Sequence, residues 1–324
     1  MHKRIGFIGL GAMGKPMATR LLQAGYEVTV TAHRNQAVVT ELVQQGAQQA
    51  DNPAGVAAQS DVIITMLPDS PDVEEICFGP EGIASGGHPE GSPEGARSSI
   101  ADKASDQSLV MIDMSTISPL AVRSLAARLQ ESGITLLDAP VSGGPWRAAS
   151  GELTIMVGGE ASQVEQQRDI LDVLGTHIVH AGPVGHGSIV KVANNMIAGM
   201  LLPALSEALT LAVKAGVRLD TLREVLATSS GNNYILEHWL PQTLFRENFE
   251  GGFALELLRK DIGLALEVGR ELDVPLPEAG LTYQLFTQAK GLGYGRQDMT
   301  AISKLYQQAA NINIVTGQPF QAEI

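Results

Sequence analysis

The chain has 324 residues, of which 44% are hydrophobic and 18% charged, enough apolar material for two domains with separate cores. Its formal net charge of −13 argues against nucleic acid as a partner, because phosphate binding needs a basic surface. The single cysteine, Cys77, excludes an intrachain disulfide and a zinc site built from cysteines. We expect Cys77 to be a packed thiol.

Neither the start of the chain nor its most apolar run indicates a membrane. The first residues, Met1–Phe7, lead directly into a strand-like run and lack the hydrophobic region of a signal peptide. The apolar run Met196–Leu205 is too short and too interrupted for a membrane span. We therefore expect a cytoplasmic protein without a membrane partner, in keeping with a reduced cysteine.

In the first half of the chain, short β-rich runs alternate with amphipathic helical patterns. The expected strands are Arg4–Gly9, Glu27–Thr31, Asp61–Met66, Leu109–Asp113, Thr135–Asp138, Leu153–Val157 and His177–Val179. The expected helices are Met13–Ala24, Gln36–Gln45, Pro119–Ser132 and Ala161–Leu174. This alternation predicts an α/β domain over residues 1–184, with a mostly parallel, doubly wound sheet.

From Gly187 onward the strand patterns disappear and helical periodicity takes over. The first helix is expected from Ser188 to about Ala215, with Pro203 inside it as a possible kink. Further helices are expected at Leu219–Thr228, Asn232–Leu240, Leu255–Leu272, Leu276–Lys290 and Thr300–Ala310. We predict an all-helical C-terminal domain over residues 185–324, joined to the first domain by the long helix.

Ser85–Gln107 departs from both patterns. It is rich in Gly, Ser, Pro and charged residues, and it stands between an expected helix and an expected strand. We interpret residues 85–107 as a surface insertion of the first domain and assign it no chemistry.

A glycine-rich turn directly follows the first expected strand and opens the first helix. It consists of Gly9, Leu10, Gly11, Ala12, Met13 and Gly14. In this strand–turn–helix context, Gly9 permits the tight turn, Gly11 lets the backbone approach a pyrophosphate, and Gly14 lets the helix pack on the strand. The helix N-terminus then faces the diphosphate, so the sequence predicts a Rossmann-type dinucleotide site.

The end of the second strand determines which dinucleotide is expected. No Asp or Glu is placed there to accept from a ribose 2′-hydroxyl; the sequence instead offers His33, Arg34 and Asn35. Because a guanidinium pairs well with a 2′-phosphate, Arg34 favours NADP, with NAD possible if Arg34 only stacks on adenine.

Five segments together resemble one family. They are Gly9–Gly14, Asp113–Pro119, Asp138–Gly144, Gly187–Asn195 and Lys260–Ala265. With them the chain resembles the β-hydroxyacid dehydrogenases, which include 3-hydroxyisobutyrate dehydrogenase, tartronate semialdehyde reductase and 2-(hydroxymethyl)glutarate dehydrogenase. The resemblance covers nearly the whole chain except Ser85–Gln107. Residues 251–261 and 293–299 are most similar to the hydroxymethylglutarate member.

Lys191 and Asn195 are the expected catalytic pair. Hydride transfer needs a group that accepts the hydroxyl proton as the carbonyl forms, and a desolvated lysine is suited to act as that base. Asn195 lies four residues further along the same helix, so both side chains share one face and the amide can hold the substrate hydroxyl or the amine. By resemblance, Lys191 corresponds to the family's catalytic lysine and Asn195 to its partner.

Small residues after a strand end predict a site for the substrate carboxylate. Ser142, Gly143 and Gly144 leave backbone N–H groups accessible, and the resemblance assigns this segment to the carboxylate. Arg147 departs from the smaller residues common in relatives. It could reach a second acidic group on the substrate or form an exposed salt bridge, and the sequence leaves both open.

The resemblance also implies further ligand contacts. Leu67, Pro68 and Thr116 end strands on the cofactor side and are expected to line the nicotinamide ribose, while Lys260 is expected to reach toward the cofactor. The run Ser229–Asn233 either contacts substrate or forms an ordinary helix cap.

The resemblance implies reversible NAD(P)-dependent oxidation of a small 3-hydroxy acid, similar to 3-hydroxyisobutyrate, to its semialdehyde, with Lys191 as general acid/base. Three alternatives remain: a catalytically silent dinucleotide-binding module, a reductase of tartronate semialdehyde or sulfolactaldehyde, and an imine reductase. We expect no metal, because no ligand pattern such as His-x-x-x-His appears. The apolar stretch Met196–Leu211 predicts burial against a partner subunit, in a homodimer or homotetramer.

Overall fold

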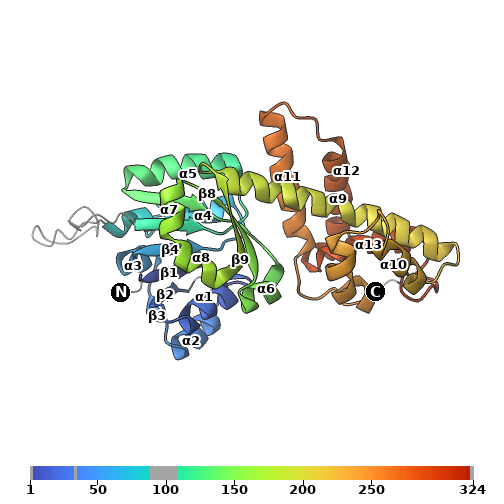
Figure 1. Cartoon of the computed structure of the whole chain (residues 1–324), viewed down its shortest axis with the longest axis horizontal. Coiled ribbons are helices and arrows are strands. Elements are labelled where there is room, and N and C mark those ends of the chain that lie inside the picture. The colour runs from blue at the N-terminus through green and yellow to red at the C-terminus, as the bar shows by residue number, and fades with distance from the viewer. Residues whose placement is uncertain (1–2, 33–34, 88–108, 322–324) are drawn as a thin grey trace, which may run out of the picture. The chain divides into compact units, whose positions relative to one another are not determined.

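The computed structural model describes residues 3–32, 35–87 and 109–321. The chain divides into two compact units, Met1–Lys191 and Val192–Ile324 (Figure 1). The division falls inside the long helix α9 (His186–Lys214), so this helix contributes to both units.

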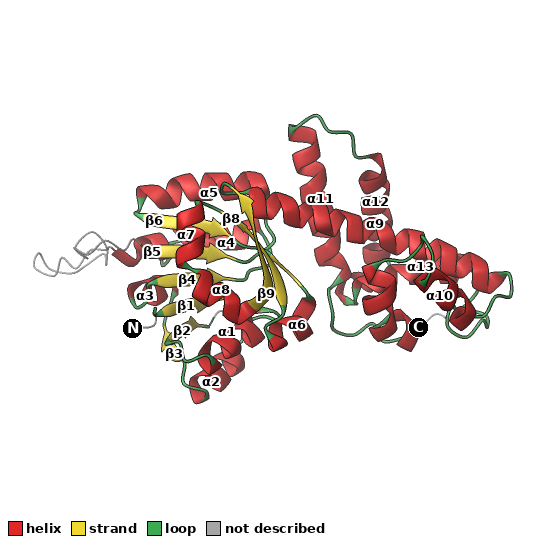
Figure 2. Cartoon of the chain, in the orientation of Figure 1, coloured by secondary structure: helices red, strands yellow, loops and turns green. Residues whose placement is uncertain are grey.

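A mostly parallel sheet forms the centre of the first unit (Figure 2). Its strands are β1 (Ile5–Ile8), β2 (Val28–Thr31), β3 (Gln48–Ala50), β4 (Val62–Thr65), β5 (Leu109–Asp113), β6 (Ile134–Asp138), β7 (Val141–Ser142), β8 (Leu153–Gly158) and β9 (Gly175–Gly182). The order across the sheet is β3-β2-β1-β4-β5-β6-β8-β7, with β9 also paired to β8. Strand β8 runs antiparallel to β6 and β7, and the other pairs are parallel.

Helices cover both faces of this sheet. They are α1 (Gly14–Gln23), α2 (Gln36–Gln44), α3 (Pro53–Ala58), α4 (Ser70–Phe78), α5 (Pro119–Glu131), α6 (Gly144–Ser150), α7 (Ala161–Gln166) and α8 (Arg168–Leu174). Side chains of α1, α2, α6, α7 and α8 pack on one face, and those of α3, α4 and α5 on the other. The doubly wound α/β architecture predicted from the alternating pattern is therefore confirmed.

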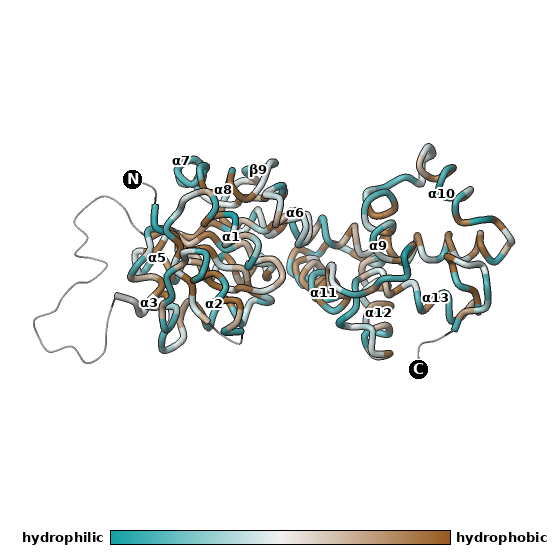
Figure 3. Tube along the Cα trace, turned by 90° about the horizontal axis from the view of Figure 1, so that it is seen from below, coloured by the Kyte–Doolittle hydropathy of each residue, from teal (hydrophilic) through white to brown (hydrophobic). Residues whose placement is uncertain are grey.

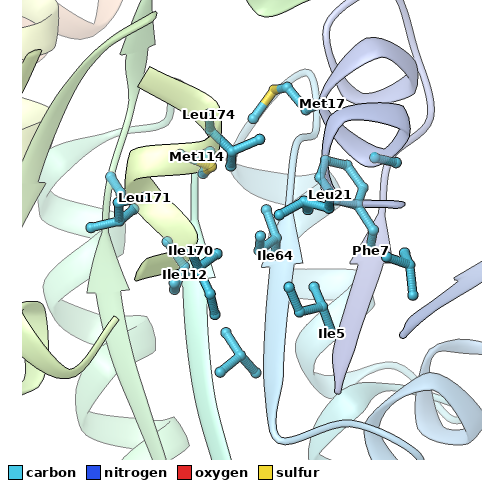
Figure 4. Close-up of a cluster of buried hydrophobic side chains, with 14 of the residues drawn as sticks. Ile5, Phe7, Met17, Leu21, Ile64, Ile112, Met114, Ile170, Leu171 and Leu174 are labelled. Carbon is cyan, nitrogen blue, oxygen red and sulfur yellow. The ribbon is translucent and has the colours of Figure 1, made fainter. Parts of the chain in front are cut away.

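Consecutive residues of each central strand belong to different cores, as the two-residue period of a strand requires. Ile64 packs in the core beneath α1 and α8, while its neighbour Ile63 packs in the core beneath α4 and α5. Figure 4 shows the first of these cores, where Phe7 and Ile64 lie beside Leu21 of α1 and Ile112 lies beside Ile170 of α8. The central strands are thus apolar on both faces, as is typical of a parallel sheet covered by helices. Because β1, β4, β5 and β6 pair in parallel, their carboxyl ends lie at one edge of the sheet.

Several elements of the first unit depart from the predicted ones. Strands β3 and β7 and helices α3 and α6 were not predicted, while α4 lies where a helix was expected, without bounds, before the insertion. The single helix expected over Ala161–Leu174 is divided at Gln167. Of the expected insertion, residues 85–87 belong to the 3₁₀ turn Ile83–Gly87, and residues 88–107 lie outside the described residues. Cys77 is buried, which confirms the packed thiol.

The second unit is helical throughout its described part. Besides α9 it contains α10 (Leu219–Ala227), α11 (Leu255–Glu271), α12 (Pro277–Gly291) and α13 (Ser303–Ala310). The helix expected over Asn232–Leu240 is wrong in type, because Ile235–Trp239 forms a π-helical turn and Leu240–Gln242 a 3₁₀ turn. Pro241 accounts for the change, since its ring cannot continue an α-helix from the preceding turn.

A buried carboxylate organises the segment that leads into α11. Asp298 accepts hydrogen bonds from the backbone N–H of Phe253 (3.1 Å), the indole Nε1 of Trp239 (3.1 Å) and the hydroxyl of Thr300 (2.7 Å). Burial raises the pKa of Asp298, whereas these donors favour its ionised form. Asp298 therefore ties three separate segments of the second unit together.

The core of the second unit uses much of the apolar surface of α9. Leu202, Leu205 and Leu209 are buried against α11 and α12, whereas Ile197 and Leu211 are exposed. This unit therefore covers part of Met196–Leu211, and burial of the remainder against a partner subunit stays a prediction. In Figure 3, α9 carries long hydrophobic stretches, and by length and composition alone it could cross a membrane, although 44% of its most apolar window is buried within the protein.

Candidate active site

The glycine-rich turn after β1 has the geometry that a dinucleotide phosphate requires. Gly9 has a φ of +102°, and a Cβ at Gly9 would collide with the carbonyl oxygen of Met66. A Cβ at Gly14 would collide with the carbonyl oxygen of Gly9, so only glycine lets α1 approach the strand. A Cβ at Gly11, by contrast, would have no neighbouring heavy atom within 4 Å, as expected where the backbone would meet a ligand.

The residues between these glycines are accessible. Gly11 and Ala12 are exposed, while Leu10 and Met13 are half-buried against the core beneath α1. The backbone N–H groups at the start of α1, a helix of ten residues, lie directly after the open turn. The turn and the helix N-terminus therefore fit the diphosphate of NAD(P).

The residues expected to select the cofactor lie after β2. Asn35 caps α2, since its side-chain oxygen accepts from the backbone N–H of Val38 over 3.4 Å. This cap gives Asn35 a structural role in addition to the expected cofactor contact. His33 and Arg34 lie outside the described residues.

Two further strand ends are joined by a buried polar network. The carboxylate of Asp113, the last residue of β5, accepts from the hydroxyl of Thr65 (2.8 Å) and the backbone N–H of Ser115 (3.2 Å). The hydroxyl of Ser115 in turn accepts from the backbone N–H of Leu67 (2.8 Å). This network fixes the backbone around Leu67, which was expected at the nicotinamide ribose.

Pro68 and Thr116 follow the same two strand ends. Pro68 comes directly after Leu67, and Thr116 directly after Ser115, where it is half-buried. Burial raises the pKa of Asp113, and the neighbouring Asp138 carboxylate raises it further. Asp113 and Ser115 were not among the predicted site residues, although they belong to the segment that carried the family resemblance.

Ser142, Gly143 and Gly144 form a turn between β7 and α6. Ser142 pairs with Thr154 of β8, which places it at the end of the antiparallel part of the sheet. Gly143 and Gly144 have φ values of +144° and +72°, which side chains other than hydrogen rarely allow. Glycine turns of this kind can present backbone N–H groups to an anion, and the assignment of this turn to the substrate carboxylate stays a prediction.

Arg147 lies one turn into α6, next to this glycine turn. Its Cβ and Cδ would lie 2.8 Å and 3.1 Å from a Cβ at Gly143, so its aliphatic stem crosses the glycine at close range. Within the described part of the chain, no carboxylate forms an ion pair with the Arg147 guanidinium. The exposed salt bridge that the sequence left open is therefore not found there.

Lys191 stands on the second turn of α9, at the end of the first unit, and only 7% of it is exposed. Asn195 follows one helical turn later on the same helix. A long ammonium-bearing side chain is rarely buried without a specific role, so its burial agrees with a functional assignment rather than with a solvated surface lysine.

In the second unit, Asn195 belongs to a buried polar cluster with α11. Its Nδ2 donates to Oδ2 of Asp261 over 2.6 Å, and Oδ1 of Asp261 lies 3.0 Å from Nζ of Lys260. Asp261 is 1% exposed. Lys260 thus lies beside the partner of Asn195, and Asp261 is a site residue that sequence reasoning missed, although it follows Lys260 directly in the family motif.

The polar run Ser229–Asn233 serves as a cap. The side-chain oxygen of Asn233 accepts from the backbone N–H of Leu236 over 3.0 Å, which matches the ordinary helix-cap interpretation. Across residues 3–32, 35–87 and 109–321, no group of three or more His, Cys, Asp or Glu residues is arranged to hold a metal ion.

Comparison with known proteins assigns both parts of the chain. The NAD binding domain of 6-phosphogluconate dehydrogenase matches residues 4–182, and the NAD-binding domain of NADP-dependent 3-hydroxyisobutyrate dehydrogenase matches residues 185–306. These two matches, the glycine turn and the fold define a dinucleotide-dependent oxidoreductase.

Individual relatives extend over the whole chain. The chain is 41% identical to 2-(hydroxymethyl)glutarate dehydrogenase of Eubacterium barkeri, over 97% of this chain and 98% of the relative. It is 38% identical to 3-hydroxyisobutyrate dehydrogenase of Pseudomonas aeruginosa, over 94% and 98%. The structure of Mycobacterium tuberculosis 3-hydroxyisobutyrate dehydrogenase with L-serine superimposes with a TM-score of 0.79 at 28% identity, covering 94% of this chain and 99% of that one.

The chain therefore belongs to the β-hydroxyacid dehydrogenase family, as the five motifs predicted. It is an NAD(P)-dependent oxidoreductase acting on hydroxy acids.

Proposed function

We propose that this enzyme oxidises the hydroxymethyl group of a small 3-hydroxy acid, with Lys191 as the general acid/base. The buried amine of Lys191 on α9, one turn before Asn195, is the observation that supports this role most directly. In the oxidation direction the neutral Nζ accepts the proton from the substrate hydroxyl oxygen. In the reduction direction the Nζ ammonium returns that proton to the carbonyl oxygen.

NAD(P)⁺ supplies the hydride acceptor when bound. The residues that would hold it are Gly9, Leu10, Gly11, Ala12, Met13 and Gly14 at the diphosphate, with Leu67, Pro68 and Thr116 at the nicotinamide side and Lys260 as a further contact. Open space at Gly11 and the fixed backbone at Leu67 support this assignment. We also propose that Arg34, with His33 and Asn35, favours NADP over NAD.

The remaining polar groups would orient the substrate. Ser142, Gly143 and Gly144 bind the carboxylate in this proposal, because their turn offers N–H groups and a hydroxyl. Asn195 holds the reacting hydroxyl, or the Lys191 amine, in register. Such positioning accounts for a large part of the rate gain in bimolecular reactions.

Arg147 narrows the proposed substrate to acids with a second carboxylate. Its stem crosses Gly143, and its guanidinium has no ion pair with a described carboxylate, so it is available to an anionic substituent. A glutarate carries two carboxylates, and the Eubacterium barkeri relative is named for a substituted glutarate. The candidate substrate is thus a hydroxymethyl dicarboxylic acid, with 3-hydroxyisobutyrate as a monocarboxylic alternative.

A substrate panel tests this proposal. 2-(Hydroxymethyl)glutarate, 3-hydroxyisobutyrate, L-serine and glycerate would each be assayed with NADP⁺ and NAD⁺. We expect the highest kcat/KM with the dicarboxylic acid, and the Arg147→Ala variant should lose that advantage while keeping its activity on 3-hydroxyisobutyrate. Absence of turnover with every acid, and with the corresponding semialdehydes, would favour a silent dinucleotide-binding module instead.

We further propose that the protein self-associates through the second unit. Ile197, Leu211, Leu272 and Leu281 remain 54% or more exposed, and a partner subunit would remove these large apolar side chains from water. Light scattering should give a dimeric or tetrameric mass, and a monomeric mass would contradict the proposal.

A further inference from the structure

A buried carboxylate at a strand end attaches the start of α9 to the sheet. Asp138, the last residue of β6, is 1% exposed. Its Oδ1 accepts from the backbone N–H of Gly185 over 2.7 Å, and its Oδ2 accepts from the backbone N–H of Ser188 over 2.7 Å. Both donors belong to the first turn of the helix or precede it, where backbone N–H groups have no partner within the helix.

This attachment is short and tightly packed. A Cβ at Gly187, between the two donors, would lie 2.7 Å from the carbonyl oxygen of Asp138 and 2.9 Å from the backbone nitrogen of Gly158. Backbone of the helix therefore rests directly on the ends of β6 and β8, with no side chain between them. The helix start has little freedom to shift along the edge of the sheet.

The charge of Asp138 suits this position. Its carboxylate faces the N-terminus of a 29-residue helix, where the peptide dipoles favour a negative charge. Burial raises the pKa of Asp138, while the N–H donors of Gly185 and Ser188 act in the opposite direction. Because the carboxylate is buried, water competes little for its oxygens, and the two hydrogen bonds are charge-assisted.

Lys191 follows Ser188 by three residues, so the two residues lie on neighbouring turns of the same helix face. We infer that Asp138 is a positioning residue for the reaction, because its carboxylate fixes the first turn of α9 and thereby the place of the Lys191 amine. This inference rests on the proposed role of Lys191. Asp138, the first residue of the Asp138–Gly144 motif, would thus position the catalytic lysine, whereas the turn at the end of the motif would bind the substrate carboxylate.

Asp113 offers a matched control for Asp138. The two residues are direct partners in the β5–β6 register, both end their strands, and both are buried carboxylates with raised pKa values. Asp113, however, accepts from Thr65 and Ser115 and has no hydrogen bond to α9 among the described residues. Replacing Asp113 should therefore change the affinity for cofactor without acting through Lys191.

A double-mutant cycle tests the inference, with 2-(hydroxymethyl)glutarate and NADP⁺ as the assay pair. Asp138→Asn keeps the size of the side chain but turns an NH₂ group toward one N–H donor. We expect kcat to fall about 10- to 100-fold, with the KM for NADP⁺ within about twofold, because displacing a catalytic group by about 1 Å costs about that much. In a Lys191→Ala background, Asp138→Asn should lower kcat no further.

The outcomes separate the two claims. If Asp138→Asn lowers kcat by the same factor with and without Lys191, Asp138 has only a structural role and the inference is overturned. For the control Asp113→Asn, we expect any loss of kcat to be the same in both backgrounds. Full turnover in Lys191→Ala would overturn the proposed function itself. If Asp138→Asn fails to fold, Asp138→Glu keeps the charge and shifts the helix start by about one carbon–carbon bond, about 1.5 Å. Its loss of kcat must likewise vanish in the Lys191→Ala background, and a loss that persists there would refute the inference.

Discussion

Asn195 Nδ2 donates to Asp261 Oδ2 over 2.6 Å, which links α9 to α11 inside the second unit. Because a carboxylate only accepts, this bond assigns the amide nitrogen to Asp261 and leaves Oδ1 of Asn195 on the other side. That oxygen accepts a hydrogen bond from Nδ2 of Asn194 over 3.0 Å. The orientation of a proposed substrate-binding amide is thus determined by a buried acid 66 positions away.

Replacing Asp261 should disturb both stability and substrate binding. Asp261→Leu removes the acceptor for Asn195 and the partner of Lys260, and we expect the free energy of unfolding to fall by about 1.5–3 kcal/mol. The KM for the hydroxy acid should rise about tenfold, since the amide is no longer held. Denaturant unfolding and steady-state kinetics measure the two effects. Asp261→Asn, which retains an acceptor oxygen, should show smaller changes. A normal KM in Asp261→Leu would mean that Asp261 does not determine the orientation of the Asn195 amide.

Two glycines of the nucleotide turn should respond differently to alanine. At Gly11 a Cβ has open space, so Gly11→Ala should fold with an unchanged Tm but bind NADP⁺ at least tenfold more weakly. At Gly14 a Cβ meets the carbonyl oxygen of Gly9, so Gly14→Ala should lower the Tm as well. Calorimetry and fluorescence titration distinguish the two. Equal cofactor affinity of Gly11→Ala and the parent protein would place the diphosphate elsewhere.

Arg34 should set the preference between the two dinucleotides. In Arg34→Asp the guanidinium is replaced by a carboxylate, which repels a 2′-phosphate and can accept from a ribose 2′-hydroxyl. We expect kcat/KM for NADP⁺ to fall at least tenfold while that for NAD⁺ is maintained or rises. His33→Ala provides a milder comparison. An unchanged kcat/KM for NADP⁺ in Arg34→Asp would show that another residue sets the preference between NADP and NAD.

Cys77 should be unreactive in the native protein. Burial raises the pKa of its thiol from an ordinary value of 9.0 to about 12, so at pH 8 only about one molecule in 10⁴ carries the reactive thiolate. The folded state favours the neutral thiol; the resulting stabilisation is complete below pH 9 and is lost as the pH rises toward 12. A thiol reagent at pH 8 should label the unfolded chain once and the native chain hardly at all. Rapid native labelling would contradict the buried position.

The sequence predicted those parts of the fold that depend on local patterns. The central strands and the glycine turn after Ile8 could be predicted because the role of each residue there depends on its near neighbours in the sequence. The missed elements are short: β3 is three residues and α3 is six. Helix α3 and helix α4, which was expected without bounds, are marked chiefly by the residues that cap them, Asn52 and Asp69. Such caps are readable in principle, from a capping residue followed by proline within the first turn.

The missed site residues were beyond any local pattern. Asp138 acts on Gly185 and Ser188, 47 and 50 positions away, and Asp113 acts on Thr65, 48 positions away. A buried aspartate at a strand end gives no local sign of its partner, because tertiary packing decides which backbone N–H group it meets. Lys191 and Asn195, by contrast, could be proposed from helical spacing together with the family motif.

The central claim is that the Lys191 amine passes the substrate proton, and the Lys191→Ala variant tests it most directly. Single-turnover reduction of enzyme-bound NADP⁺ by 2-(hydroxymethyl)glutarate would be followed by absorbance, with cofactor affinity measured separately. The account predicts a rate about 10²–10⁴-fold below that of the parent protein, with NADP⁺ affinity unchanged. A rate equal to the parent's, at the same cofactor occupancy, would remove Lys191 from the reaction.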